Sequence, residues 1–118
     1  MIIGGGGHAK VLIDCIESIK TYEIYGIIDP GLPADSLLGD ISVLGGDDKL
    51  AALGAEGYLF ALGIGMTKST SRRKTFFLDL KKKGFRFPFL VHSSSTVSSR
   101  VMLGEGVQIM AGAVIQPF

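Results

Sequence analysis

Cysteine, histidine and charged residues are all scarce in this sequence, and each scarcity excludes a class of protein. The single Cys15 excludes a disulfide framework and a cysteine-rich zinc site, and is typical of a reducing cytoplasm. The two histidines, His8 and His92, lie far apart and predict no metal site. Twelve basic against eleven acidic residues leave a net charge of +1. The chain therefore has no basic surplus that would attract nucleic acid or an anionic membrane.

Long hydrophobic runs are also missing. No uncharged run exceeds thirteen residues, which is short of the roughly 18 that a membrane-spanning helix needs. The start, Met1-Ile2-Ile3-Gly4, has no basic residues, so we expect no signal peptide. These absences predict a cytoplasmic protein without a membrane or nucleic-acid partner. Because 47% of the 118 residues are hydrophobic, the chain can still bury the core of about one domain.

Glycine is in excess, with 17 in 118 residues, about twice the usual ~7%. Four glycines, Gly4 to Gly7, separate a short apolar strand, Met1–Ile3, from residues with the hydrophobic spacing of a helix. Cys15 lies within the apolar stripe of that helix, where we expect a buried structural thiol. The glycines thus occupy a strand-to-helix connection.

This connection has the pattern of a phosphate-binding loop. Gly4-x-Gly6-x-x-Ala9 fits G-x-G-x-x-G/A, in which glycines let a phosphate approach backbone N–H groups at a helix N-terminus. Asp29 follows Gly6 by 23 residues, near the ~20 expected for an acid that binds ribose. His8 is predicted either to contact a phosphate or sugar or to be an inert first-turn residue. A tight turn that only packs helix on strand would also explain the glycines.

Strand and helix patterns alternate up to His92, which predicts an α/β fold with a small Rossmann-like parallel sheet. The expected strands are 23–28, 41–44, 58–62 and 85–91, and the expected helices are 47–53 and 71–83. The candidate polar contacts after Gly63-Ile64-Gly65 are Thr67, Ser69, Thr70, Arg72 and Arg73. The run Lys81–Lys83 is predicted to be a solvated helix end rather than a phosphate patch. His92, before three serines, is expected to cap a turn.

A different pattern begins near His92. Aliphatic residues stand six apart, at Val91, Val97, Leu103, Ile109 and Ile115. The fifth position of each hexad is small or β-branched, at Ser95, Val101, Val107 and Ala113. Period six is typical of a β-helix, in which three hexads make one triangular coil. We therefore expect residues 1–92 to form the α/β domain and residues 93–118 to begin a β-helix. Because one coil is too little to be stable alone, we expect the chain to be a fragment that continues beyond Phe118.

No catalytic constellation accompanies these patterns. The chain has no G-x-S-x-G, no H-E-x-x-H and no P-loop lysine.

Several motifs together resemble one family, the bacterial sugar O- and N-acetyltransferases of the sialic acid and bacillosamine type, which are hexapeptide-repeat acyltransferases. The motifs are Gly4-Gly5-Gly6-Gly7-His8-Ala9-Lys10-Val11, Asp29-Pro30, Val43-Leu44-Gly45-Gly46, Leu62-Gly63, Leu90-Val91-His92 and the hexads from Val97. The similarity covers essentially the whole chain but only about the first half of a typical member.

The resemblance implies a domain that binds a nucleotide-linked sugar, commonly a UDP-sugar, for an acetyl-CoA-dependent transferase. Gly5, Gly6, Gly7 and His8 would lie against the diphosphate and sugar, Asp29 and Pro30 near the base or ribose, and Gly63 and Ile64 along the same pocket. Family members are homotrimers built on a left-handed β-helix, with acetyl-CoA between neighbouring coils and a histidine as general base.

Two features of the family have no counterpart here. The family's catalytic histidine and its acetyl-CoA groove come after the position of Phe118, so we expect no catalytic residue and no bound cofactor in this chain, and no activity from it alone. Ser93 also replaces a proline that often follows the junction histidine.

Two other functions remain open at this point. A dinucleotide-binding oxidoreductase or sensor module would explain the glycine loop and Asp29, but not the hexads. A hexapeptide scaffold whose α/β domain only docks a partner would explain both.

Overall fold

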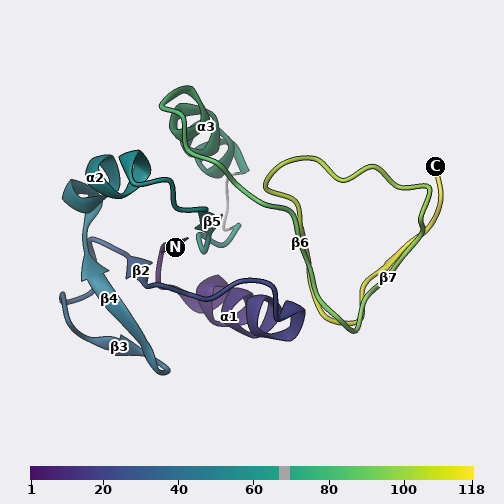
Figure 1. Cartoon of the computed structure of the whole chain (residues 1–118), viewed down its shortest axis with the longest axis horizontal. Coiled ribbons are helices and arrows are strands. Elements are labelled where there is room, and N and C mark those ends of the chain that lie inside the picture. The colour runs from purple at the N-terminus through teal and green to yellow at the C-terminus, as the bar shows by residue number, and fades with distance from the viewer. Residues whose placement is uncertain (67–69) are drawn as a thin grey trace.

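A mixed five-stranded sheet is the centre of the computed structural model, which describes residues 1–66 and 70–118 (Figure 1). The strand order is β3-β4-β2-β1-β5. The parallel strands are β1 (Ile2–Ile3), β2 (Ile27–Ile28), β4 (Ile41–Gly45) and β5 (Ala61–Leu62). At one edge, β3 (Leu37–Leu38) pairs antiparallel with β4. The predicted α/β class is confirmed.

Helices cover both faces of this sheet. The helix α1 (Gly7–Ile19) packs on one face, and α2 (Leu50–Ala55) and α3 (Thr70–Lys82) pack on the other, with a single 3-10 turn, η1 (Asp47–Lys49), before α2. Because successive strand residues point to opposite faces, Ile2 packs with α1 whereas Ile3 packs with α2 and α3. Both isoleucines are almost fully buried, which explains the uninterrupted apolar strand.

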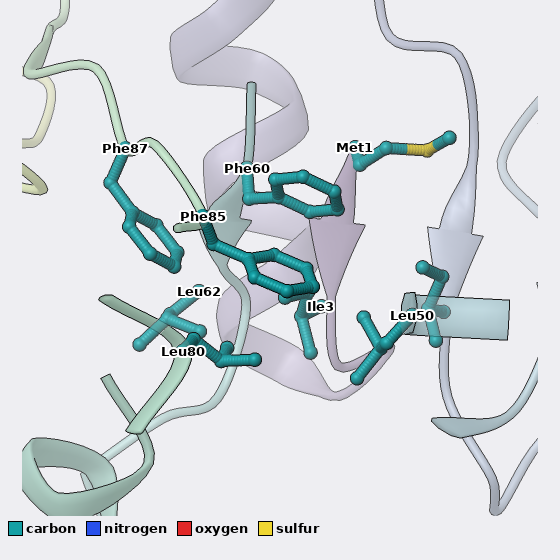
Figure 2. Close-up of a cluster of buried hydrophobic side chains, with 9 residues drawn as sticks. Met1, Ile3, Leu50, Phe60, Leu62, Leu80, Phe85 and Phe87 are labelled. Atoms are coloured by element: carbon teal, nitrogen blue, oxygen red, sulfur yellow. The ribbon is translucent and has the colours of Figure 1, made fainter. Parts of the chain in front are cut away.

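Aromatic side chains fill the core on the α2 and α3 side (Figure 2). The Phe60 ring lies 4.7 Å from that of Phe85 and 6.4 Å from that of Phe87, centroid to centroid. Phe60 comes from the end of the chain segment that leads into β5, and the other two from the segment after α3. These contacts fix the chain after α3 against the sheet, and so they determine where the C-terminal segment begins.

Four elements differ from the sequence predictions. The strands predicted over 23–28 and 58–62 are limited to β2 and β5, because their shared partner β1 is itself only two residues long. Residues 31–40, which lie in none of the predicted strands and helices, contain β3. In the strand predicted over 85–91, Arg86 forms an isolated bridge to Leu59, just before β5, but Pro88 has no N–H to continue the ladder, and β6 (Leu90–Val91) pairs elsewhere.

The hexad region pairs with itself at a constant offset. Strand β6 pairs in parallel with β8 (Gln108–Ile109), and β7 (Thr96–Val97) pairs in parallel with β9 (Val114–Ile115). Leu90 faces Gln108 and Thr96 faces Val114, so each partner lies 18 residues further on, the length of three hexads. In Figure 1 the chain after β6 makes one wide turn and returns beside its own start. We refer to residues 90–118 as the C-terminal coil.

The C-terminal coil is attached to α1. The Cys15 thiol lies 3.7 Å from the Ile109 carbonyl oxygen, and the Ser93 N–H donates to the Ser18 hydroxyl at 3.1 Å. Leu90 is buried in the same hydrophobic cluster as Leu12. The two parts of the chain therefore share a core across α1.

Within residues 1–66 and 70–118, no helix has the length and apolar character that crossing a bilayer would require.

Gly63 offers a test of how closely β1 and β5 pack at their ends. A Cβ at Gly63 would lie 2.4 Å from the Gly4 carbonyl oxygen and 2.8 Å from Cγ2 of Ile2. We predict that Gly63→Ala lowers the free energy of unfolding by about 2 kcal/mol or more, because backbone must move to admit the methyl group. Urea unfolding of the variant measures this loss.

Gly104→Ala is the matched control, since a Cβ at Gly104 meets no atom within 4 Å. We expect the free energy of unfolding of this variant to stay within about 0.5 kcal/mol of that of the wild type. Equal losses in the two variants would contradict the packing argument.

The amino terminus predicts a pH dependence of stability. The Met1 amine donates to the Leu59 carbonyl at 2.9 Å, and burial lowers its pKa from 8.0 to about 6. The unfolded chain therefore binds this proton more readily than the folded chain does. This contribution to stability is complete well above pH 8 and decreases by about 2 kcal/mol as the pH falls from 8 to 6.

Chemical denaturation at pH 6, 7 and 8 tests this, with N-acetylated Met1 as the control. Acetylation keeps an N–H donor for Leu59 but removes the titration. Between pH 8 and pH 6, the free energy of unfolding should decrease by about 2 kcal/mol more for the free chain than for the acetylated chain. Identical pH profiles would disprove the contribution.

Candidate functional site

A cleft of about 730 Å³ lies at the carboxyl ends of β1, β2 and β5, the edge at which open parallel sheets bind ligands. The glycine loop, Gly4 to Gly7, forms one wall and α3 forms the opposite wall. Five of the predicted site residues line the cleft, namely Gly6, Asp29, Pro30, Gly63 and Ile64. Gly5, Gly7 and His8 lie next to it in the chain but do not line it.

The four glycines of the loop meet very different surroundings. Gly4 has a φ of +97° and packs on Ile64, and a Cβ at Gly5 would lie 2.4 Å from a methyl group of Leu32. These two glycines are needed for packing. In contrast, among residues 1–66 and 70–118, a Cβ at Gly6 or Gly7 would meet no atom within 4 Å other than those of its chain neighbours and the backbone of α1. Their lack of side chains leaves open space in front of the first turn of α1.

That first turn presents unpaired N–H groups to the open space. Gly6 is the N-cap of α1, and no side chain in the described parts of the protein caps the helix. The first N–H groups of a helix have no partner within it, and the helix dipole adds positive charge there. Acidic side chains are absent from the turn. The loop can therefore accept an anion with its backbone.

Asp29 holds the glycine loop in place. The Gly5 N–H donates to Oδ2 of Asp29 at 2.6 Å, and the Gly31 N–H donates to Oδ1 at 2.7 Å. The carboxylate thus joins the end of β2 to the loop after β1. Because an ionised carboxylate has about four acceptor sites, it can still accept a hydrogen bond from a ligand.

His8 points to the C-terminal coil rather than to open solvent. Its Nε2 lies 2.9 Å from Oε1 of Gln108, and the same oxygen accepts from the Arg73 guanidinium at 2.8 Å. The Gln108 amide nitrogen donates to the Leu62 carbonyl at 3.2 Å. We call these four residues the Gln108 network.

The partners in this network fix the proton positions. Arginine can only donate and a carbonyl can only accept, so the Gln108 oxygen must face Arg73 and its nitrogen must face Leu62. His8 therefore carries its proton on Nε2 and donates it to Gln108. No hydrogen bond from residues 1–66 or 70–118 reaches the imidazole Nδ1, so this nitrogen can accept one from a ligand.

Sequence analysis identified His8 and Arg73 but not Gln108. The hexad phase places Ile109 inside the coil and so its neighbour Gln108 outside, which is the only relevant signal in the sequence. Nothing in it indicates that this outer position meets α1 and α3. Of the other candidate contacts, Arg72 lines the cleft, whereas Thr67 and Ser69 lie outside the described residues. Thr70 begins α3.

The remaining candidates have structural partners. Burial, and secondarily the charge of Asp14, raises the pKa of the Cys15 thiol, which is typical of an inert thiol. The His92 Nδ1 accepts from the Ser94 N–H at 3.0 Å, as expected for a residue that caps a turn. Lys81 pairs with Glu105 across to the coil. No group of three potential metal ligands occurs in the described parts of the chain.

A second cavity, of about 530 Å³, lies between α3, β5 and the C-terminal coil. It is lined mainly by apolar residues such as Phe77 and Phe87, and also by Gln108, whereas Arg73 lines both this cavity and the cleft.

Among solved structures, the chain is similar to two acetyltransferases. The perosamine N-acetyltransferase from Caulobacter crescentus, solved with CoA and GDP-perosamine, is 34% identical with a TM-score of 0.83, and the match covers 98% of this chain and 53% of that chain. The acetyltransferase domain of PglB from Neisseria gonorrhoeae, solved with acetyl coenzyme A, is 29% identical with a TM-score of 0.84, over 98% of this chain and 54% of that chain. The chain thus spans about half the length of these relatives.

A search of curated proteins gave no match. The family model of the PglD N-terminal domain matches residues 1–80, which include the glycine loop, the whole sheet and most of α3. The resemblance inferred from the sequence motifs is thereby confirmed: the chain belongs to the PglD N-terminal domain family and is similar to about half of a bacterial sugar acetyltransferase.

Proposed function

We propose that this chain is the substrate-binding half of an acetyl-CoA-dependent nucleotide-sugar N- or O-acetyltransferase of surface glycan biosynthesis in the cytoplasm, and that its substrate is a UDP-sugar. The observation that carries the proposal is the open space in front of Gly6 and Gly7, at the uncapped start of α1. A diphosphate fits there, because glycines without packing neighbours leave backbone N–H groups accessible to it.

The two ends of the cleft differ in charge, which supports one orientation of the nucleotide sugar. Asp47 lies at the β4 end, and Arg73 lies at the β5 end beside Gln108. We place the base or ribose near Asp29 and Pro30, toward Asp47, since carboxylates accept from ribose hydroxyls and base N–H groups. The diphosphate then lies on Gly5, Gly6, Gly7 and His8. The sugar extends along Gly63 and Ile64 toward the coil.

The C-terminal coil is proposed to be the first coil of a left-handed parallel β-helix, with residues 1–92 as the nucleotide-sugar domain and 93–118 as the start of the helix. The constant offset of 18 residues supports this, since three hexads make one coil. We further propose that the complete protein is a homotrimer with acetyl-CoA bound between neighbouring coils.

The chemistry would then be divided between the two halves. The sugar's amine or hydroxyl attacks the thioester carbonyl of acetyl-CoA, and a general base removes its proton as the bond forms. The C–S bond then breaks, and CoA leaves as the thiol after taking up that proton. We propose that this base is a histidine beyond Phe118. The Caulobacter crescentus enzyme has been solved with one histidine replaced by asparagine or alanine. The present chain binds and orients the acceptor, and we expect it to be inactive alone.

Calorimetric titration of UDP, GDP, CMP, NAD and acetyl-CoA into the chain tests the proposal. We predict that a nucleoside mono- or diphosphate binds and that acetyl-CoA does not. Gly6→Ala should weaken this binding about tenfold or more, since its methyl group occupies ligand space, and about 1.4 kcal/mol suffices for that factor. The stability of the variant should change by no more than about 1 kcal/mol.

Gly104→Ala, which adds a methyl group to open space away from the cleft, should bind as the wild type does. Binding of NAD alone would favour the dinucleotide module instead. Failure of every nucleotide to bind, or equal affinity of Gly6→Ala and the wild type, would contradict the proposed site.

A further inference from the structure

Arg73 is a charged side chain without a charged partner. It is partly buried on the inner side of α3, and burial lowers the pKa of its guanidinium. Its hydrogen bond goes to the neutral amide of Gln108, and among the described residues no carboxylate forms an ion pair with it. A guanidinium has five N–H donors, so most of its capacity is unused by this bond. Removing such a charge from water is unfavourable unless an anion compensates it.

The position of Arg73 indicates where that anion binds. The guanidinium and His8 Nε2 approach the same Gln108 oxygen, so Arg73 lies beside the first turn of α1. Arg73 also lines the cleft into which Gly6 opens. Gly6, at the start of α1, and the partly desolvated guanidinium therefore line the same space.

Gln108 determines the orientation of the Arg73 guanidinium. Its amide nitrogen is held by the Leu62 carbonyl, so its oxygen is fixed toward Arg73 and His8. The amide is neutral, so it orients the guanidinium without satisfying its charge. A carboxylate at position 108 would neutralise that charge.

We propose that Arg73 binds the diphosphate of the substrate and that Gln108, on the C-terminal coil, is the positioning residue that holds Arg73 and His8 toward it. The identity of the anion as a substrate diphosphate rests on the proposed function. The anion site itself rests on the cleft and the Gln108 network.

Arg72 is the matched comparison for Arg73. It has the same charge and lines the same cleft, but its side chain is exposed and no hydrogen bond to the coil holds it. An exposed, freely rotating arginine gains less from an anion, because water already solvates it and ordering it costs entropy. Comparing variants of the two residues thus distinguishes a specific anion contact at Arg73 from general electrostatic attraction by positive charge in the cleft.

The experiment is a ¹⁵N–¹H NMR titration of the chain with inorganic pyrophosphate, followed by a nucleotide sugar. We expect pyrophosphate to shift the amides of Gly6, Gly7 and His8. Arg73→Gln should weaken pyrophosphate binding about tenfold or more, as expected for loss of a charged hydrogen-bond donor. Arg72→Gln should change it by no more than about twofold. Thermal unfolding of each variant confirms that the fold is retained.

Gln108→Leu gives a readout that a purely structural role would not change. In the wild type, long-range ¹⁵N spectra of the His8 ring should show the proton on Nε2. The variant should lose this preference, and pyrophosphate should bind less tightly than in the wild type. An unchanged His8 tautomer with unchanged affinity would overturn the positioning role.

The outcomes separate this inference from the proposed function. Absence of pyrophosphate binding, or equal losses in Arg73→Gln and Arg72→Gln, would overturn the role of Arg73. If pyrophosphate binds in an Arg73-dependent manner but no nucleotide sugar does, the anion site stands and the proposed substrate is wrong. If a nucleotide sugar binds equally to wild type and Arg73→Gln, the proposed function survives and this inference fails.

Discussion

The side-chain amide of Gln108 is the interaction on which the arrangement of the site depends. It contacts α1 through His8, α3 through Arg73 and the end of β5 through the Leu62 carbonyl, while its own backbone belongs to the C-terminal coil. A net contribution of about 1 kcal/mol is usual for one hydrogen bond, and more where a charge takes part. Its larger effect is on geometry, because these hydrogen bonds fix the position of the C-terminal coil relative to α1, α3 and β5.

The glycine loop is rigid where it meets protein and open where it meets the cleft. Gly4 and Gly5 are packed against Ile64 and Leu32, and Asp29 fixes the Gly5 N–H. The next two residues are Gly6 and Gly7, where an added Cβ would contact no distant atom of the described residues within 4 Å. Because Gly4 and Gly5 are fixed by packing, the backbone N–H groups of Gly6 and Gly7 are already in position to bind an anion. Such preorganisation lowers the entropic cost of binding.

Local patterns in the sequence predicted most of the fold and part of the site. Buried runs such as Met1–Ile3 and the six-residue spacing of aliphatics predicted the sheet and the self-pairing coil, because each pattern is visible in the spacing of residues along the chain. The role of Gln108 could not be predicted, since it depends on which outer face of the coil meets α1. Nor could the division of the four glycines into two kinds, because this follows from Leu32 and Ile64, which are distant in sequence.

In the proposed binding mode, the cleft holds a nucleotide sugar with its diphosphate on the glycine loop and its sugar toward Gln108. A crystal structure of the chain with GDP-perosamine or UDP-N-acetylglucosamine bound would test this binding mode. We expect phosphorus atoms in front of Gly6 and Gly7, the base toward Asp29, and the sugar at the Arg73 end of the cleft. A reversed ligand, or one bound in the apolar cavity between α3 and the coil, would contradict it.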